Sequence, residues 1–164
     1  MPGDRESVSL RPATAADSVA VAEIWFRGWQ DGHLGHVPDE LRDARTEESF
    51  WVRAPEQVGD TTVAVVGGVV AGFVMVVGDE VEQVYVDAAH RGAGVAGVLL
   101  AEAERQVAVN GFGEAWLAVV AGNVRARRFY ERCGWVDRGG FEHLAAGGIV
   151  VPVRRYVKRV GSGT

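Results

Sequence analysis

Three apolar, β-branched runs follow one another with almost nothing between them, in TTVAVVGGVVAGFVMVVGDEVEQVYV from Thr61 to Val86. Gly67-Gly68 and Gly78-Asp79 separate these runs, and two-residue connections of this composition are typical of β-hairpins. Strands joined this closely pair antiparallel, because parallel neighbours need a crossover of about a dozen residues or more. The sequence therefore predicts an antiparallel sheet in the middle of the chain.

Apolar patterns and turn residues predict the remaining elements. We expect further strands over 9–12, 116–120, 135–141 and 149–157, and helices over 17–28, 38–51, 94–110 and 124–133. The first helix would carry Val19, Ala22, Trp25 and Phe26 on its apolar side, and the glycines and proline of WQDGHLGHVP would end it. The order predicts an α+β fold. With 164 residues we expect one domain over 1–160 and a loose tail over 161–164.

Composition restricts the functional class. A hydrophobic share of 48% with 24% charged residues is typical of a soluble globular protein. The N-terminal MPGDRESVSL lacks the apolar core of a secretory signal, and no unbroken apolar stretch reaches about 18 residues. The single Cys133 excludes an internal disulfide framework and a cysteine-based zinc site. We therefore expect a cytoplasmic protein, and the net charge of −5 argues against nucleic acid as its main partner.

The segment RGAGVAG, from Arg91 to Gly97, leads into the apolar run VLLAEAERQVA and fits two fingerprints. Its glycines form the dinucleotide-binding pattern G-x-G-x-x-G, whereas Arg91, Gly94 and Ala96 form R-x-x-G-x-A, an acyl-coenzyme A pattern. Either would hold a pyrophosphate on backbone N–H groups at the start of a helix.

The surroundings of this loop favour the second fingerprint. A dinucleotide fold needs parallel strands and an acidic residue about 20 residues further on, but the next strand ends Ala118-Val119-Val120-Ala121. No G-x-x-x-x-G-K-[ST] motif is present, which excludes a P-loop. The first acid of the following helix is Glu102, so no carboxylate competes with a phosphate at the helix start. Arg91 adds a charged donor beside the loop.

A second group of residues lies in NVRARRFYERCGW, from Asn123 to Trp135. Asn123 is placed to cap a helix, and Tyr130 follows seven residues later, which is close to two helical turns. The two side chains are therefore expected on one side of the helix, with Ala126 leaving room between them. A packing role for Tyr130 and a purely capping role for Asn123 remain open.

Together the blocks VEQVYVDAAHRGAGVAGVLLAEAE and NVRARRFYERCGW resemble the GNAT superfamily of N-acetyltransferases. The resemblance extends over the element order from Val8 to about Tyr156. One departure is Ala88, where many relatives carry proline, and it concerns the turn after the strand. The resemblance implies a GNAT-like mixed, mostly antiparallel sheet with two splayed central parallel strands and flanking helices.

The resemblance also implies the cofactor and its contacts. Acetyl-CoA would be the acyl donor, and the pantetheine arm would pair with the backbone of Val84, Tyr85 and Val86. We expect no metal, because His33 and His36 have no further ligand nearby in the sequence. Asn123 would contact the pantetheine arm, and Tyr130 would protonate the leaving thiolate. The pyrophosphate would lie on the loop residues Arg91, Gly92, Ala93, Gly94, Val95, Ala96 and Gly97.

The base and the acceptor pocket are less defined. Glu80 and Glu82 alternate with Val84 and Val86, so all four are expected on one face of the strand, and Glu82 would be the base. Glu80, a water-mediated path and solvated hairpin charges remain alternatives. The loop after the first helix offers Asp31, His33 and His36, of which His33 is expected in the acceptor pocket with Trp29 as a wall.

Two functions remain open at this point. One is transfer of an acetyl group from acetyl-CoA to a primary amine of a small molecule or peptide, by direct attack in a ternary complex. The other is a non-catalytic acyl-CoA-binding module with a sensing or regulatory role. We expect no membrane partner, and a homodimer is possible if the strand starting at Ile149 forms an edge of the sheet.

Overall fold

The computed structural model describes residues 7–33 and 35–161, so only Gly161 of the expected C-terminal tail lies in the described part. Its strands are β1 (Ser9–Pro12), β2 (Thr61–Val66), β3 (Val69–Val77), β4 (Glu80–Val86), β5 (Glu114–Val120), β6 (Val136–Leu144) and β7 (Val150–Arg159). Its α-helices are α1 (Ser18–His33), α2 (Asp39–Ala44), α3 (Glu47–Glu56), α4 (Val95–Val109) and α5 (Val124–Arg132). Short 3-10 turns are η1 (Ala15–Asp17), η2 (Val58–Asp60), η3 (Ala88–His90) and η4 (Ala146–Gly148).

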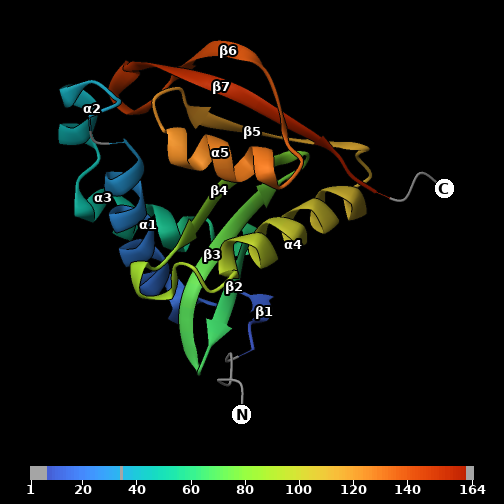
Figure 1. The fold of residues 1–164 in the computed structure, drawn as a ribbon. Helices are drawn as coiled ribbons and strands as arrows, with labels where there is room; N and C mark the ends of the chain where they lie inside the picture. Colours follow the sequence, from blue (N-terminus) through green and yellow to red (C-terminus); the bar gives the residue numbers. More distant parts are fainter. Residues whose placement is uncertain (1–6, 34, 162–164) are drawn as a thin grey trace.

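The described strands form one seven-stranded sheet in the order β1-β2-β3-β4-β5-β7-β6 (Figure 1). All neighbouring strands pair antiparallel except β4 and β5, which are parallel. The two hairpins expected between Thr61 and Val86 are present, with β4 starting at Glu80. The prediction of a mixed, mostly antiparallel sheet with central parallel strands and flanking helices is confirmed.

The two central strands separate along their length. Their described ladder consists of one residue pair, Glu80 with Trp116. Next to it, the carbonyl of Asp79 accepts from the Trp116 amide at 3.0 Å, and the Asp79 carboxylate accepts from the Trp116 indole at 3.1 Å. Beyond this point β4 and β5 diverge (Figure 1). The backbone of β4 that faces β5 is thereby left open to the space between them.

Two apolar cores lie on opposite faces of the sheet. One packs α4 and part of α5 against the strands, with Leu99, Leu100 and Tyr156 almost fully buried. The other packs α1 and α3 against the opposite face, around Trp25, Phe50 and Phe73. Within this second core the Trp25 ring meets Phe50 at 5.4 Å and Phe73 at 5.9 Å, both in edge-to-face geometry.

The first helix differs from the prediction. It does not end near Gly28 but continues to His33. Gly28 and Gly32 do not break it, because both are needed for close packing: a Cβ at Gly28 would overlap the Tyr85 ring, and one at Gly32 would lie 2.8 Å from Nδ2 of Asn123. Val19, expected on the apolar side, is 50% exposed, whereas Ala22 and Trp25 are buried as expected.

The expected helix over 38–51 is in fact two helices. Pro38 does precede the first of them, but the chain leaves the helical conformation at Arg45. Thr46 is the N-cap of α3, and its hydroxyl accepts from the Ser49 amide at 3.3 Å. This cap stabilises the start of a new helix, so the chain forms two helices instead of one. The second helix continues past Trp51 to Glu56.

The premise for a homodimer through the last strand is wrong. The strand β7 pairs with β5 on one side and with β6 on the other, so it is internal to the sheet. The edges of the described sheet are β1 and β6. In the described ranges, no helix is both long and apolar enough to cross a bilayer.

Candidate active site

A cavity of about 1090 Å³ opens where β4 and β5 separate. Its walls come from α1, β4, the loop before α4, β5 and the start of α5. The structure brings almost all of the predicted site residues to this one cavity. Those that line it are Trp29, Glu82, Val84, Tyr85, Val86, Arg91, Gly92, Gly94, Val95, Ala96, Gly97, Asn123, Tyr130 and His33, and Ala93 does not.

The glycine-rich loop is shaped for an anion. Gly92 and Gly94 have φ values of 83° and 81°, and Gly94 is the N-cap of α4. A Cβ added at either glycine would meet nothing within 4 Å, so the space above the loop is open. The first turn of α4 carries no acid, and Glu102 is occupied by Arg105 through a short salt bridge. The free amides and the positive helix end are therefore available for a phosphate group.

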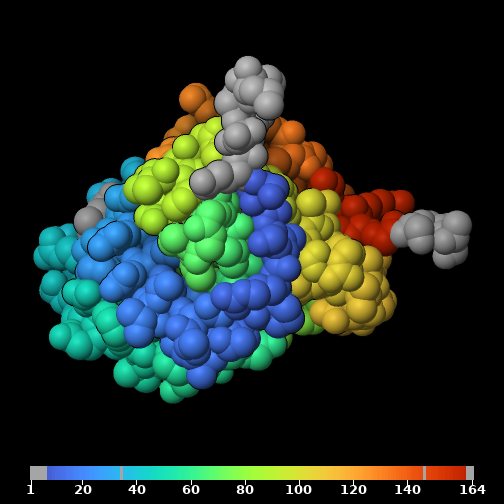
Figure 2. Space-filling model, turned by 90° about the horizontal axis from the view of Figure 1, so that it is seen from below, coloured from blue at the N-terminus to red at the C-terminus, as the bar shows by residue number. Residues whose placement is uncertain are grey.

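Arg91 is held by a partner from a distant part of the chain. Its guanidinium donates to the Asp31 carboxylate on α1 at 2.7 Å. In the view from below, the yellow-green loop lies against the blue residues of α1 (Figure 2). The ion pair therefore joins the anion loop to the first helix. Asp31 was considered for the acceptor pocket, and the structure shows it engaged at the loop instead.

The helix α5 brings Asn123 and Tyr130 to the cavity, as the seven-residue spacing predicts. The side-chain oxygen of Asn123 accepts from the Ala126 amide at 3.2 Å, which confirms the cap and leaves Nδ2 free to face Gly32. Burial raises the pKa of Tyr130 to about 12. The hydroxyl is thus protonated at neutral pH, and the Tyr130 ring rests against Trp135 and Tyr156.

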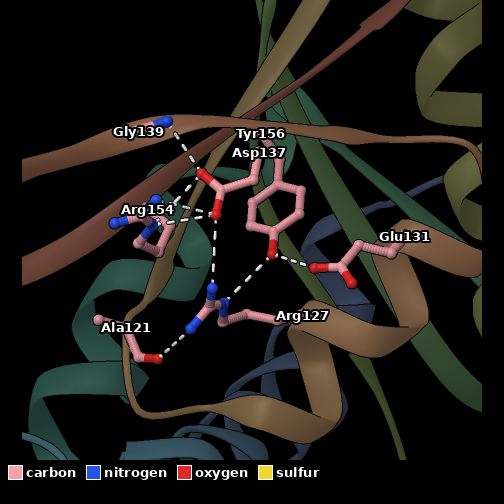
Figure 3. Close-up of polar contacts among 7 residues, drawn as sticks. All are labelled: Ala121, Arg127, Glu131, Asp137, Gly139, Arg154 and Tyr156. Carbon is pink, nitrogen blue, oxygen red and sulfur yellow. Dashed lines mark hydrogen bonds and ion pairs between the residues drawn. The ribbon is translucent and has the colours of Figure 1, made fainter.

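A polar network beneath α5 fixes this helix on the sheet (Figure 3). Asp137 on β6 accepts from Arg154 at 3.0 Å and from Arg127 at 3.4 Å. Arg127 also donates to the Ala121 carbonyl at 2.9 Å and to the Tyr156 hydroxyl at 3.2 Å. Tyr156 in turn donates to Glu131 at 2.5 Å. These contacts join α5 to β6, β7 and the turn that follows β5, and they orient the helix that carries Tyr130.

The expectation that Glu80 and Glu82 share a face with Val84 and Val86 is wrong. The register between β3 and β4 shifts so that Gln83 faces Met75 and Val81 faces Val76, which leaves Glu82 as an extra residue in a β-bulge. The bulge inverts the alternation, and Val81 shares the α4-side core with Val84 and Val86.

Glu82 therefore points to the other side of the sheet. Its electrostatic neighbours are Asp60 and Arg53, from the segment after α1. Burial is the main cause that raises the pKa of Glu82, Asp60 raises it further, and Arg53 lowers it. Glu80 also lines the cavity, and burial with the charges of Glu82 and Asp79 raises its pKa. Both carboxylates thus bind a proton more readily than exposed ones do.

His33 and Trp29 stack on each other at the end of α1. Their ring centroids are 5.0 Å apart with an interplanar angle of 11°. Nδ1 of His33 lies 2.9 Å from the Trp29 carbonyl oxygen, which can only accept, so Nδ1 carries the proton. Burial lowers the pKa of His33 to about 4, although the Trp29 carbonyl opposes this shift. The imidazole is therefore neutral at pH 7 with Nε2 unprotonated.

His33 should make the stability of the protein depend on pH. Its pKa is about 4 in the folded chain and about 6.5 in an unfolded one, so acidification between these values protonates only the unfolded chain. The contribution is complete above pH 6.5 and is lost as pH falls toward 4, by at most about 3 kcal/mol. Urea unfolding from pH 7.5 to 4 should show a flatter pH dependence for His33→Gln than for the unchanged chain.

Two checks accompany this measurement. The exposed His143, replaced by glutamine, should leave the slope unchanged. Asp17, whose pKa is lowered to about 2 mainly by its bond to Arg11, loses its contribution only at more acidic pH. Parallel curves for His33→Gln and the unchanged chain would contradict the assignment of a neutral, buried imidazole.

Sequence reasoning missed several residues that line the cavity. Gly32 was interpreted as a helix breaker and Gly28 was not singled out, although their spacing of four residues places them on one side of a helix. Arg45 and Arg53 were missed because the chain around them was expected to form a helix ending at Trp51. A signal was available for Arg53: it follows Phe50 by three residues, so it adjoins the apolar stripe of its helix.

Comparison with known proteins agrees with this geometry. Residues 19–135 match the model of the acetyltransferase (GNAT) family. None of the curated proteins matches the sequence significantly. A GCN5-related N-acetyltransferase structure from Rhodopseudomonas palustris has a TM-score of 0.77 and 22% identity, covering 94% of this chain and 98% of that chain.

Two further structures share the fold. The structure of yncA from Salmonella typhimurium, with its cofactor acetyl-CoA, has a TM-score of 0.71 and 17% identity, covering 96% of both chains. PaiA N-acetyltransferase from Thermoplasma acidophilum, in complex with coenzyme A, has a TM-score of 0.66 and 17% identity, covering 92% of this chain and 99% of that one. With most of its length matched by the family model, this chain belongs to the GNAT family of acetyltransferases.

Proposed function

We propose that this protein transfers an acetyl group from acetyl-CoA to a primary amine of a small molecule or peptide, by direct attack in a ternary complex. The observation that carries the proposal is the single cavity that joins an anion-binding loop, a protonated tyrosine and two half-buried carboxylates. The related structures with bound acetyl-CoA or coenzyme A support the choice of donor.

The donor would occupy the gap between the central strands. Backbone amides of the loop from Gly92 to Gly97 would bind its diphosphate, and the open backbone of Val84 to Val86 would pair with its pantetheine arm. Nδ2 of Asn123 is free to donate to the same arm. Acetyl-CoA supplies an acetyl group already activated as a thioester, so a C–S bond breaks as the new C–N bond forms.

The protein's own residues would move the protons. An amine with a pKa near 10.4 is mostly charged at pH 7, and its deprotonation costs about 4–5 kcal/mol. Glu82, directly or through water, would accept the proton that leaves the attacking nitrogen. Tyr130, which holds its proton at neutral pH, would donate to the leaving thiolate. A backbone N–H of β4 would stabilise the negative charge that develops on the thioester oxygen.

Two measurements test this proposal. Calorimetric titration with coenzyme A and acetyl-CoA should show binding, and mass spectrometry across an amine panel should show products heavier by one acetyl group. Absence of coenzyme A binding would refute the proposal as a whole. Binding without transfer to any amine would instead favour a non-catalytic acyl-CoA-binding module.

The glycine at the start of α4 offers a sharper test of donor binding. In Gly94→Ala the new side chain meets no atom within 4 Å, but a φ of 81° strains an alanine by about 1–2 kcal/mol. Relief of that strain turns the loop amides away, so the Kd for coenzyme A should rise about tenfold or more. Gly111→Ala is the matched control, because Gly111 has a φ of 95° and open space at the other end of α4. That variant should lose stability but keep its affinity for coenzyme A, and equal losses of affinity would contradict the loop assignment.

A further inference from the structure

Two partly buried arginines in the cavity wall have no counter-ion among the described residues. Arg45 follows α2 and Arg53 lies on α3, and both are partly buried and line the cavity. All ion pairs in the described part of the chain involve other cations. A partly buried guanidinium without a partner is unfavourable, because it has lost water and gained no anion.

Arg53 is held in place by aromatic rings. Its guanidinium carbon lies 4.2 Å from the centroid of the Trp25 ring and 5.3 Å from that of Phe50. A cation–π contact of this kind does not use the N–H groups as hydrogen-bond donors, and none of the described side-chain hydrogen bonds involves Arg53. The edge of Arg53 is therefore a rigid fork of donors, suited to a carboxylate or another small oxyanion.

The two arginines form one positive region. Burial lowers the pKa of Arg53 to about 10, and the neighbouring charge of Arg45 is the second cause. Burial also lowers the pKa of Arg45. The charge of Arg45 also lowers the pKa of His33, so Arg45 is close enough to influence both that ring and Arg53. Arg53 stays charged at neutral pH, and the positive region reaches from α3 to the end of α1.

The same cavity also holds carboxylates that no described cation pairs with. Glu80 and Glu82 are half-buried on β4, and neither takes part in a described ion pair. Glu82 and Arg53 influence each other's charge but do not form a salt bridge. Opposite charges are thus kept apart within one cavity, an arrangement complementary to a ligand that carries both signs.

This region lies away from the part proposed for the donor. Arg53 is near Glu82, which belongs to the first half of β4, whereas the glycine-rich loop follows the end of that strand. The arginine of the loop, Arg91, is already paired with Asp31. Arg45 and Arg53 are therefore not needed for the diphosphate, and a different anion is their natural partner.

We propose that the acceptor is a small amino acid, whose carboxylate binds to Arg45 and Arg53 while its primary amine is directed toward Glu82. This inference rests on the proposed acetyl transfer and names the acceptor class. The fork of Arg53 recognises the carboxylate, and the separation between the arginines and Glu82 selects molecules that carry an amine and an anion together. The product is an N-acetylated amino acid.

The test compares matched acceptors. Free L-amino acids are assayed beside their α-amides and the corresponding decarboxylated amines, with acetyl-CoA at saturation. At least one amino acid should exceed its amide and its amine by about 100-fold in kcat/KM, because a site built for a polar group rejects analogues that lack it. Calorimetric titration of the coenzyme A complex with the same compounds gives a binding measurement that needs no turnover.

Substitution of the arginines should remove this preference. Arg45→Gln and Arg53→Gln should each lower the ratio of kcat/KM for the amino acid to kcat/KM for the decarboxylated amine by about 30-fold or more, because only the amino acid carries the carboxylate. Arg53→Lys keeps the charge without the fork and covers the case in which Arg53→Gln fails to fold. Arg42→Gln is the matched control, since Arg42 is exposed on α2 and pairs only with Asp43.

The outcomes separate the two proposals. Transfer to neutral amines or to peptides with equal or greater efficiency overturns the amino-acid inference but keeps the acetyltransferase. Absence of amino-acid binding to the coenzyme A complex overturns it as well. Binding of amino acids that depends on Arg45 and Arg53, without any transfer, supports the carboxylate site at these arginines but overturns both the acceptor assignment and the proposed catalysis. Absence of coenzyme A binding refutes the proposed function itself.

Discussion

Replacing Trp25 with alanine is expected to lower the free energy of unfolding by about 3–5 kcal/mol. The Trp25 side chain is only 1% exposed and forms the centre of the core between the sheet and the helices α1 and α3. Its loss removes two edge-to-face contacts and leaves a hole that backbone elements on both sides keep open. Since a domain is stable by only about 5–15 kcal/mol, this is the largest effect on stability that we expect from one substitution.

The free energy of unfolding is measured by urea denaturation, monitored by far-ultraviolet circular dichroism because this signal reports on the backbone and not on the tryptophan that is replaced. Trp51→Ala is the matched control, because Trp51 is 40% exposed on the neighbouring helix and should change stability by no more than about 0.5 kcal/mol. The variant Trp25→Ala also removes the ring beneath Arg53. Similar losses for the two tryptophans would show that this core does not support the fold as described.

Replacing Tyr130 with phenylalanine is expected to lower kcat by about 100-fold, within the range that a general acid contributes. The ring and its contacts with Trp135 and Tyr156 remain, so only the proton donor is lost. The effect should not be larger, because a thiol with a pKa near 8.5 is a tolerable leaving group without protonation. The Kd for coenzyme A should stay within about twofold.

Steady-state kinetics and calorimetry separate the two quantities. Arg128→Ala serves as the control on the same helix, since Arg128 is exposed and does not line the cavity. An unchanged kcat would rule out Tyr130 as the acid. A weakened Kd at constant kcat would instead assign its hydroxyl to donor binding.

The parts of the fold that sequence predicted well are those with strong local signals. The hairpins between Thr61 and Val86 depend on short glycine turns, and the helix from Val95 is indicated by its glycine N-cap and its apolar residues. The spacing of Asn123 and Tyr130 is a property of the helix alone, so their shared position on the cavity was also predictable.

The predictions from sequence were wrong or incomplete where contacts between distant parts of the chain determine the local structure. Gly28 is tolerated inside α1 because the Tyr85 ring occupies the place of its side chain, and nothing local to the helix reveals that ring. The bulge at Glu82 depends on the register with β3, so the strand pattern alone suggested a regular alternation. The exposure of Arg45 and Arg53 to the cavity depends on how α2 and α3 pack against distant strands.

The central strands β4 and β5 are joined only near Asp79, Glu80 and Trp116 in the described sheet, so this contact can act as a pivot between them. Separating β4 and β5 further would break one residue pair, whereas every other pair of neighbouring strands in the described sheet is joined by at least four residue pairs. The sheet therefore behaves as two stiff plates joined at a corner. A small change in the angle between the plates would alter the width of the cavity, and because both apolar cores contain residues from either plate, their side chains would have to repack as the angle changes.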